Sequence, residues 1–534
     1  MHLPRSLRAP LVLVSAALAA LSTTAASSVR NGVADAVPSA WHAPTALTEN
    51  GPVRGLVTTD VSEFLGLPYA APPTGNLRWR APKPAADWTG VRDATQFGPS
   101  CPQLPSPFMP SGPVNEDCLY LNVYTPTPNE WHRGPPHPVL VWIHGGGLTE
   151  GAGRSYNPTA LAADGTVVVT INYRLGPLGF LAHPALASWP GGPAGNYGLM
   201  DQQAALRWVQ RNIRSFGGDP GNVTIAGESA GGLSVLAHLV SPGSRGLFEK
   251  AIVESGAFAL AQQSLSSAET FGEGVAAAAG CPDQTAACLR NLPVGTLLSS
   301  FPSFAIPGVV DGKVLTQSIG TALATGRFAH VPVLNGVNHD EELLFVILTT
   351  PVSGGTFVQL TAAVTDANYQ QTIESTLGVS AARAAAIAVE YPTSAYGGSA
   401  PIAFSVVMSD SNFACPALQV DRWTSARAST FTYEFDDDAA SPRFPVATHG
   451  SELPLLFGLP DAPNQTPLTP DEQALSATMQ AAWASFAANG DPSTPALPWP
   501  SFNRAENGLS LRTPQPVVDS QFAARHHCSF WDEG

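Results

Sequence analysis

The sequence predicts an α/β fold with a large, mostly parallel central sheet flanked by helices. Three observations predict it: short apolar runs without the alternation of a half-exposed strand, an amphipathic helix between two of these runs, and glycine-rich turns at their ends. Continuous apolar runs of about four to eight residues are typical of strands buried on both faces, as in a parallel sheet covered by helices. We therefore expect one α/β architecture over much of the chain.

The amphipathic segment at residues 200–216 places apolar side chains at helical spacing, and the turn at residues 217–220 ends it. Residues 361–391 are alanine-rich and helical in character, and we expect them to lie over the sheet as part of a cap. The candidate strands are the apolar runs at residues 138–143, 166–171, 223–226, 251–253 and 331–334.

Residues 1–28 have the organisation of a secretory signal peptide. Arg5 and Arg8 precede an apolar run at residues 11–21, and small residues follow up to Ser28. The run is shorter than the roughly 20 residues that a membrane-spanning helix needs. We therefore expect a signal peptide, no membrane span, and a secreted protein in an extracellular or periplasmic location.

The amino-acid composition limits the kinds of partner that the protein is expected to bind. Hydrophobic residues make up 44% of the chain and charged residues 13%, which is typical of a globular protein. The formal net charge of −15 disfavours nucleic acids and anionic membrane surfaces as partners. The sequence indicates no cofactor, and it leaves the oligomeric state open.

Six cysteines in a secreted chain predict disulfides, although sequence alone does not choose among the 15 possible pairings. Metal ligation is the alternative, but no C-x-x-C or H-x-x-x-H pattern is present, so we expect no metal site. Two pairs of cysteines lie close along the chain and two cysteines remain: Cys101 with Cys118, Cys281 with Cys288, and the remaining Cys415 and Cys528.

The stretch VTIAGESAGG, residues 223–232, has the organisation of a nucleophile elbow. In such an elbow a strand, a tight turn and a helix hold a serine in a strained conformation. Gly227 and Gly231 remove side chains that would collide in the turn. The helix that begins after Ser229 points its N–H groups at the reacting centre. Ser229 is therefore the candidate nucleophile.

A serine needs a base, and the base needs a group that orients it. In hydrolases with this elbow the partners follow in the order serine, acid, histidine. Glu341 follows a candidate strand and His449 lies in a later loop, with Asp340 and Glu342 as alternative acids. The other histidines considered as the base are His144, His238, His526 and His527.

The glycine run at residues 145–147 follows a candidate strand. A glycine loop lets backbone N–H groups approach the oxygen of a tetrahedral intermediate, and the N–H of Ala230 adds another donor. The loop is therefore the candidate oxyanion hole.

The chain also resembles the type-B carboxylesterases, which include cholinesterases, bacterial para-nitrobenzyl esterases and fungal lipases. The resemblance extends along most of the chain after the signal segment, and EDCLYLNV at residues 116–123 is its most specific motif. The other matching stretches are residues 64–70, 72–79, 195–202 and 216–220.

This resemblance implies an α/β-hydrolase fold in a single domain at residues 29–534. It implies Ser229 as nucleophile, Glu341 as acid and His449 as base. It further implies the oxyanion-hole positions Gly146, Gly147 and Ala230, the neighbouring positions Glu228 and Ser255, and the disulfides Cys101–Cys118, Cys281–Cys288 and Cys415–Cys528.

The chain departs from the family pattern in three places. Glu342 follows the acid where the family commonly has glycine, and Leu148 follows the glycine run where an aromatic residue is usual. The loop from Cys101 to Cys118 contains no tryptophan. Cholinesterases bind choline with a tryptophan of that loop. A choline ester is therefore disfavoured, and Leu148 is expected to change the acyl side of the pocket.

The sequence thus predicts a secreted serine carboxylesterase that hydrolyses small-molecule carboxylic esters through an acyl-enzyme. A lipase, an amidase or a polymer esterase with the same triad is the alternative, because fold and triad do not identify the bond that is cleaved. A non-catalytic binding or adhesion protein on the same fold is a further alternative.

Overall fold

The computed structural model describes residues 43–106, 112–126, 134–187, 194–301, 308–347, 364–437, 446–459 and 467–532. The predicted signal peptide at residues 1–28 therefore lies outside the described residues. Among the described helices, none combines the length and apolar character that a membrane crossing requires.

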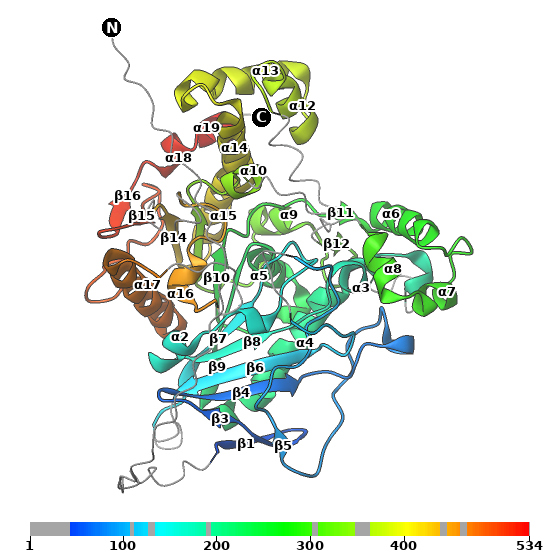
Figure 1. Ribbon diagram of the computed structural model, residues 1–534. Coiled ribbons are helices and arrows are strands. Elements are labelled where there is room, and N and C mark those ends of the chain that lie inside the picture. The colour runs from blue at the N-terminus through cyan, green and yellow to red at the C-terminus, as the bar shows by residue number, and fades with distance from the viewer. Residues whose placement is uncertain are drawn as a thin grey trace, which may run out of the picture. The chain divides into compact units, whose positions relative to one another are not determined.

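The core of the fold is an 11-stranded sheet in the order β16-β15-β14-β13-β10-β9-β7-β8-β6-β4-β3 (Figure 1). Neighbouring strands from β15 to β8 pair in parallel, and antiparallel strands continue the sheet on both sides. The strands are β3 Leu56–Val57, β4 Val61–Pro68, β6 Tyr120–Pro126, β7 His137–Ile143, β8 Val167–Ile171, β9 Gly218–Glu228, β10 Lys250–Glu254, β13 Val333–Asn338, β14 Thr430–Phe435, β15 Gly508–Leu511 and β16 Val517–Asp519.

Both faces of the parallel part are buried, as the continuous apolar runs predict. Side chains that alternate along β7 enter two different cores: Val141 joins one cluster, and Trp142 joins the other. The first cluster takes in α4 Tyr197–Asn212 and α5 Ala230–Val240. The second takes in α2 Thr159–Ala163, α16 Leu453–Leu456 and α17 Pro470–Asn489.

Smaller elements surround the sheet. A three-stranded sheet joins β1 Thr45–Thr48, β2 Gly51–Arg54 and β5 Arg92–Asp93, and a two-stranded sheet joins β11 Gln263–Ser264 and β12 Val309–Val310. Further α-helices of the described residues are α3 Gly176–Phe180, α6 Leu265–Ala278, α7 Ala286–Asn291, α8 Val294–Ser299, α9 Ile319–Ala324, α10 Leu343–Ile347, α18 Phe522–Arg525 and α19 Cys528–Asp532.

The described part of the alanine-rich segment, residues 364–391, forms two helices, α12 Tyr369–Leu377 and α13 Ala381–Glu390, because Gly378 takes a left-handed conformation with φ 64° and ends the first one. Figure 1 shows them next to α14 Ala400–Ser409, and the three helices bury their apolar side chains in a cluster of their own. The segment thus packs on another helix rather than directly on the sheet. A π-helix, η7 Asp410–Ala414, joins α14 to α15 Cys415–Ser425.

Three disulfides connect Cys101 with Cys118, Cys281 with Cys288, and Cys415 with Cys528. The third joins residues 113 positions apart, so it fastens α19 near the end of the chain to the start of α15. These are the pairs that the family resemblance implies.

A buried ion pair joins the end of β8 to α4. Arg174 donates from Nε to Asp201 Oδ2 at 2.6 Å and from Nη2 to Oδ1 at 2.7 Å. The two side chains are 3% and 0% exposed. Loss of either charge would therefore leave the other one unpaired in the interior.

We expect Arg174→Met to lower the free energy of unfolding by about 3–5 kcal/mol, because the Asp201 carboxylate would stay buried without its partner. The matched control is Arg54→Met, which removes the exposed pair between Arg54 and Asp93. Exposed pairs contribute about 0–1 kcal/mol. Urea denaturation of both variants measures the difference, and equal losses would contradict this interpretation of the buried pair.

Candidate active site

The candidate residues gather at the carboxyl ends of the parallel strands, the edge where open α/β sheets bind ligands. Glu228 and Glu254 end the neighbouring strands β9 and β10 and lie opposite each other in register. Ser229 and Ser255 follow them directly, and Glu341 follows β13.

Ser229 has the strained backbone of a nucleophile elbow. Its φ is 55° and its ψ is −123°, between the last residue of β9 and the first residue of α5. A non-glycine residue in such a region costs about 1–3 kcal/mol unless the surroundings impose it. The Ser229 N–H donates to the Glu254 carbonyl at 2.8 Å, and the residue is half-buried.

Glycines allow the turn to close. A Cβ at Gly231 would lie 1.9 Å from the Ile143 carbonyl oxygen, and one at Gly227 would lie 2.6 Å from the Gly231 carbonyl carbon. A Cβ at Gly145 would lie 3.1 Å from Ser229 Cβ. The glycine loop after β7 therefore packs directly against the elbow.

His449 pairs with Glu341. Its Nδ1 donates to Glu341 Oε2 at 2.5 Å, and its backbone N–H donates to the Glu341 carbonyl at 3.2 Å. The other carboxylate oxygen, Oε1, accepts from Ser255 Oγ at 2.5 Å and from the Asn338 N–H at 2.8 Å. Glu341 is 0% exposed, so these donors hold its charge in the interior.

The alternative acids have other partners. Glu342 accepts at Oε1 from Asn412 Nδ2 at 3.2 Å, and burial raises its pKa to about 7. The Asp340 N–H donates to the Ala447 carbonyl. In place of the family's usual glycine, Glu342 thus adds a buried acid that contacts the π-helix η7.

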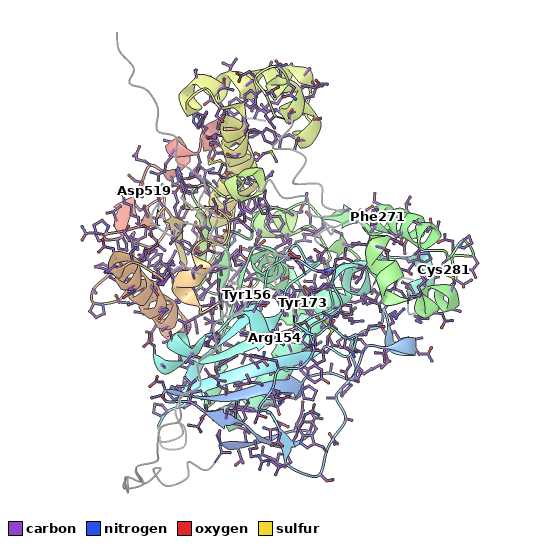
Figure 2. All side chains as sticks on the ribbon, viewed as in Figure 1. Arg154, Tyr156, Tyr173, Phe271, Cys281 and Asp519 are labelled. Carbon is purple, nitrogen blue, oxygen red and sulfur yellow. A yellow bond between two sulfur atoms is a disulfide. The ribbon has the colours of Figure 1, made fainter. Side chains whose placement is uncertain are left out.

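The alternative bases also have other partners. His144 stacks on Tyr173 with ring centroids 4.4 Å apart, and burial lowers its pKa to about 4. His238 Nε2 donates to Gln202 Oε1 at 2.9 Å inside the fold. Figure 2 labels Tyr173 above the central sheet, and its hydroxyl donates to the His144 carbonyl at 2.7 Å.

Glu228 is the second carboxylate at His449, with its Oε1 3.2 Å from Nε2. Burial by itself lowers the pKa of His449, but the charges of Glu228 and Glu341 outweigh it and raise the pKa above its usual value. Burial raises the pKa of Glu228, against the opposing charge of His449. The carboxylates of Glu228 and Glu341 therefore stabilise a proton on the imidazole of His449.

Two further buried acids, Glu452 and Glu254, lie near this site, and neither was predicted from the sequence. Glu452 Oε2 accepts from Asn338 Nδ2 at 2.5 Å, and Glu254 Oε1 accepts from Trp483 Nε1 at 2.8 Å. Burial, together with the charge of Glu228, raises the pKa of both acids. Glu452 stands three positions after His449, in the loop sequence THGSE. Its nearness to the candidate base along the chain was therefore the signal that could have indicated it.

Aromatic rings enclose the imidazole. The ring centroids of Phe345 and Phe413 lie 5.3 Å and 5.1 Å from that of His449, and Phe258 packs against Phe413 at 5.5 Å. The rings come from α10, the π-helix η7 and the segment after β10. Two of the rings thus pack against the imidazole, whose side chain is 10% exposed.

The glycine loop has the backbone that an oxyanion hole needs. Gly146, Gly147 and Leu148 have φ values of 92°, 61° and 62°, so three successive residues are left-handed. Ala230, the first residue of α5, is buried. The Leu148 side chain is 3% exposed and belongs to the core.

Groups that could hold a metal ion lie outside this site. Among the described residues they are Cys281 with Asp283 and Cys288, and His339 with Glu434 and His526. The first group contains a disulfide, so its sulfurs cannot serve as thiolate ligands.

Comparisons with known proteins agree with this architecture. The sequence model described as "Carboxylesterase family" matches residues 42–531. The chain is 38% identical over 518 residues to the cocaine esterase of Homo sapiens, covering 91% of each chain. It is 37% identical over 483 residues to the para-nitrobenzyl esterase of Bacillus subtilis (strain 168), covering 85% of this chain and 92% of that protein. A solved structure of a PNB esterase superposes with a TM-score of 0.77 at 34% identity, covering 92% of this chain and 100% of the other. The α/β-hydrolase fold is thereby confirmed.

We expect Gly231→Ala to lower the free energy of unfolding by about 3 kcal/mol or more, because its Cβ would overlap the Ile143 carbonyl. The control is Gly274→Ala in α6, where nothing lies within 4 Å of the added Cβ. That change should stabilise the protein by about 0.5–1 kcal/mol through helix propensity. Thermal unfolding of both variants measures the contrast, and a neutral Gly231→Ala would contradict the close packing of the elbow.

Proposed function

The chain belongs to the carboxylesterase family, and from this premise we propose that it is a secreted serine esterase with the triad Ser229, Glu341 and His449. It is a carboxylic ester hydrolase, as its relatives are. The observation that carries the proposed triad is the contact of His449 with Glu341 at 2.5 Å, together with its contact with Glu228, the residue directly before the strained Ser229.

The proposed reaction has two halves. Ser229 Oγ attacks the ester carbonyl while His449 Nε2 takes the hydroxyl proton, and the imidazolium then gives that proton to the departing alcohol. A water molecule then attacks the acyl-enzyme with the same base, which releases the acid and restores Ser229. Glu341 orients the imidazole through Nδ1 and stabilises its charged form.

The oxyanion of each tetrahedral intermediate would be held by the N–H groups of Gly146, Gly147 and Ala230. The left-handed backbone of the glycine loop and the position of Ala230 at the start of α5 support this role. Ser255 would act through Glu341, since its hydroxyl donates to the carboxylate, and Glu228 through His449.

We also propose that the protein is secreted. The signal-like order of residues 1–28 and three disulfides support it, because disulfides persist in oxidising compartments. The relatives are a cocaine esterase, a para-nitrobenzyl esterase and acylcarnitine hydrolases, so a small-molecule carboxylic ester is the proposed substrate class.

We expect Ser229→Ala to lower kcat for p-nitrophenyl acetate and butyrate by about 10⁴-fold or more, because the acyl-enzyme could not form. The control is Ser266→Ala on the exposed start of α6, which should leave kcat unchanged. A fluorophosphonate probe should label the wild type at Ser229 alone. Equal hydrolysis by a folded Ser229→Ala protein would refute the triad, and an unlabelled wild type would indicate a non-catalytic binding protein.

The pH profile tests the role of Glu228. Its carboxylate favours the imidazolium, so Glu228→Gln should lower the pKa of His449. Because the base must be neutral, the acidic limb of kcat/KM should move to lower pH by about one unit. Glu273→Gln, on the exposed face of α6, should leave the profile in place. A limb that stays in place or moves to higher pH in Glu228→Gln would contradict this electrostatic role.

A further inference from the structure

Two histidines and a glutamate meet outside the active site. His339 follows β13, Glu434 lies in β14 and His526 follows α18, and we call these three residues the His–Glu–His cluster. Glu434 is separated from the two histidines by 95 and 92 positions in the sequence. The cluster therefore exists only in the folded protein, and no sequence motif signals it.

One carboxylate oxygen faces both imidazoles. His339 Nδ1 lies 2.6 Å and His526 Nε2 lies 2.8 Å from Glu434 Oε1. The three ligand atoms all lie within 4.8 Å of one another. Two imidazole nitrogens and a carboxylate oxygen are a common set of three protein ligands for a zinc ion, with a fourth position left for water.

The groups behind the cluster have the arrangement that supports metal ligands. His526 donates from its other nitrogen, Nδ1, to Asp410 Oδ1 at 2.6 Å. Asp410 Oδ2 accepts from the Tyr391 hydroxyl at 2.9 Å, and Tyr391 accepts from Trp531 Nε1 at 2.7 Å. A carboxylate that fixes the second nitrogen of a ligating histidine is the usual support in zinc sites, since it sets the tautomer and strengthens the ligand.

Arg525 fixes the ligating glutamate. Its Nη2 donates to Glu434 Oε2 at 2.7 Å and also pairs with Asp519, so Glu434 Oε1 remains the oxygen that faces the histidines. Asp519 is the last residue of β16 and is labelled in Figure 2.

The charge of the surroundings suits a dication. The carboxylates of Glu434, Asp410 and Asp519 surround the cluster together with Arg525, and Asp340 and Asp436 add negative charge near His339 and Arg525. These carboxylates outnumber the guanidinium groups of Arg525 and Arg512, which favours a divalent cation. The side chains of His526 and Glu434 are 3% and 2% exposed, whereas that of His339 is 30% exposed and leaves a route for entry.

We propose that the His–Glu–His cluster binds one divalent transition-metal ion of the zinc class through His339 Nδ1, Glu434 Oε1 and His526 Nε2. Zinc–ligand distances of about 2.0–2.2 Å set neighbouring ligand atoms of a tetrahedral site about 3.4 Å apart. The two nitrogens would thus move from the carboxylate oxygen by about 0.6–0.8 Å, and the partly exposed His339 is freer to make this shift than the buried His526.

The bound ion would join three parts of the fold. His339 stands two positions before Glu341, and His526 stands two positions before Cys528 of the disulfide to Cys415. An ion at the cluster would fasten the end of β13 to β14 and to the segment before α19. This role in stability does not depend on the proposed catalytic triad.

The test is isothermal titration of the full-length, EDTA-treated protein with zinc chloride at about pH 8, where zinc binding is expected to release protons from the imidazoles. We expect one zinc ion per chain and a higher melting temperature with zinc. His339→Ala should weaken binding by about 100-fold or more, and Asp410→Asn by about 10-fold or more through His526. The matched control is His527→Ala, because His527 pairs with Glu390 outside the cluster.

Three results would overturn the proposal: no saturable zinc binding, binding that His339→Ala leaves unchanged, or equal loss in the His527→Ala control. If His339→Ala does not fold, His339→Gln replaces it and keeps a neutral polar group at the position. Magnesium chloride should not compete, because magnesium prefers octahedral oxygen ligands.

Discussion

The conformation of one residue, Ser229, constrains the architecture around it. A serine with φ 55° and ψ −123° is held in place only if the strand before it and the helix after it cannot move apart. Glycines permit that closeness. A Cβ at Gly232 would lie 2.9 Å from Gly256 Cα, so α5 and the segment after β10 touch backbone to backbone. The sheet and α5 thereby maintain the strain at the serine.

The same strand ends concentrate negative charge. Glu228 and Glu254 end adjacent parallel strands, and parallel pairing brings such residues to one edge. Glu341 and Glu452 enter the edge from loops, and one imidazole faces the group. Buried carboxylates repel one another and lose hydration, so burial raises the pKa of Glu228, Glu254 and Glu452. The single cation that His449 can supply is stabilised by the carboxylates that surround it.

Local sequence patterns predicted the parts of the fold that depend on neighbours along the chain. The buried strands at residues 138–143 and 166–171, the helix before β9 and the elbow all have such patterns. The packing of the cap differed from the expectation that residues 361–391 lie over the sheet. Their sequence predicts helices, but it does not indicate which surface the helices pack on. Glu254 directly follows the predicted strand at residues 251–253, and its role in the acidic group depends on the pairing of β10 with β9. His339, Glu434 and His526 meet through the order of strands in the sheet, which no local pattern encodes.

The order of strands also has a consequence for how the protein is made. β14 pairs on one side with β13 and on the other with β15, which the chain reaches only at Gly508. A ribosome that has produced the strands up to β14 has therefore released a sheet with an open hydrogen-bonding edge. Such an edge can pair with a second nascent chain. Shielding of β14 until β15 has been made is thus a requirement that the topology itself imposes.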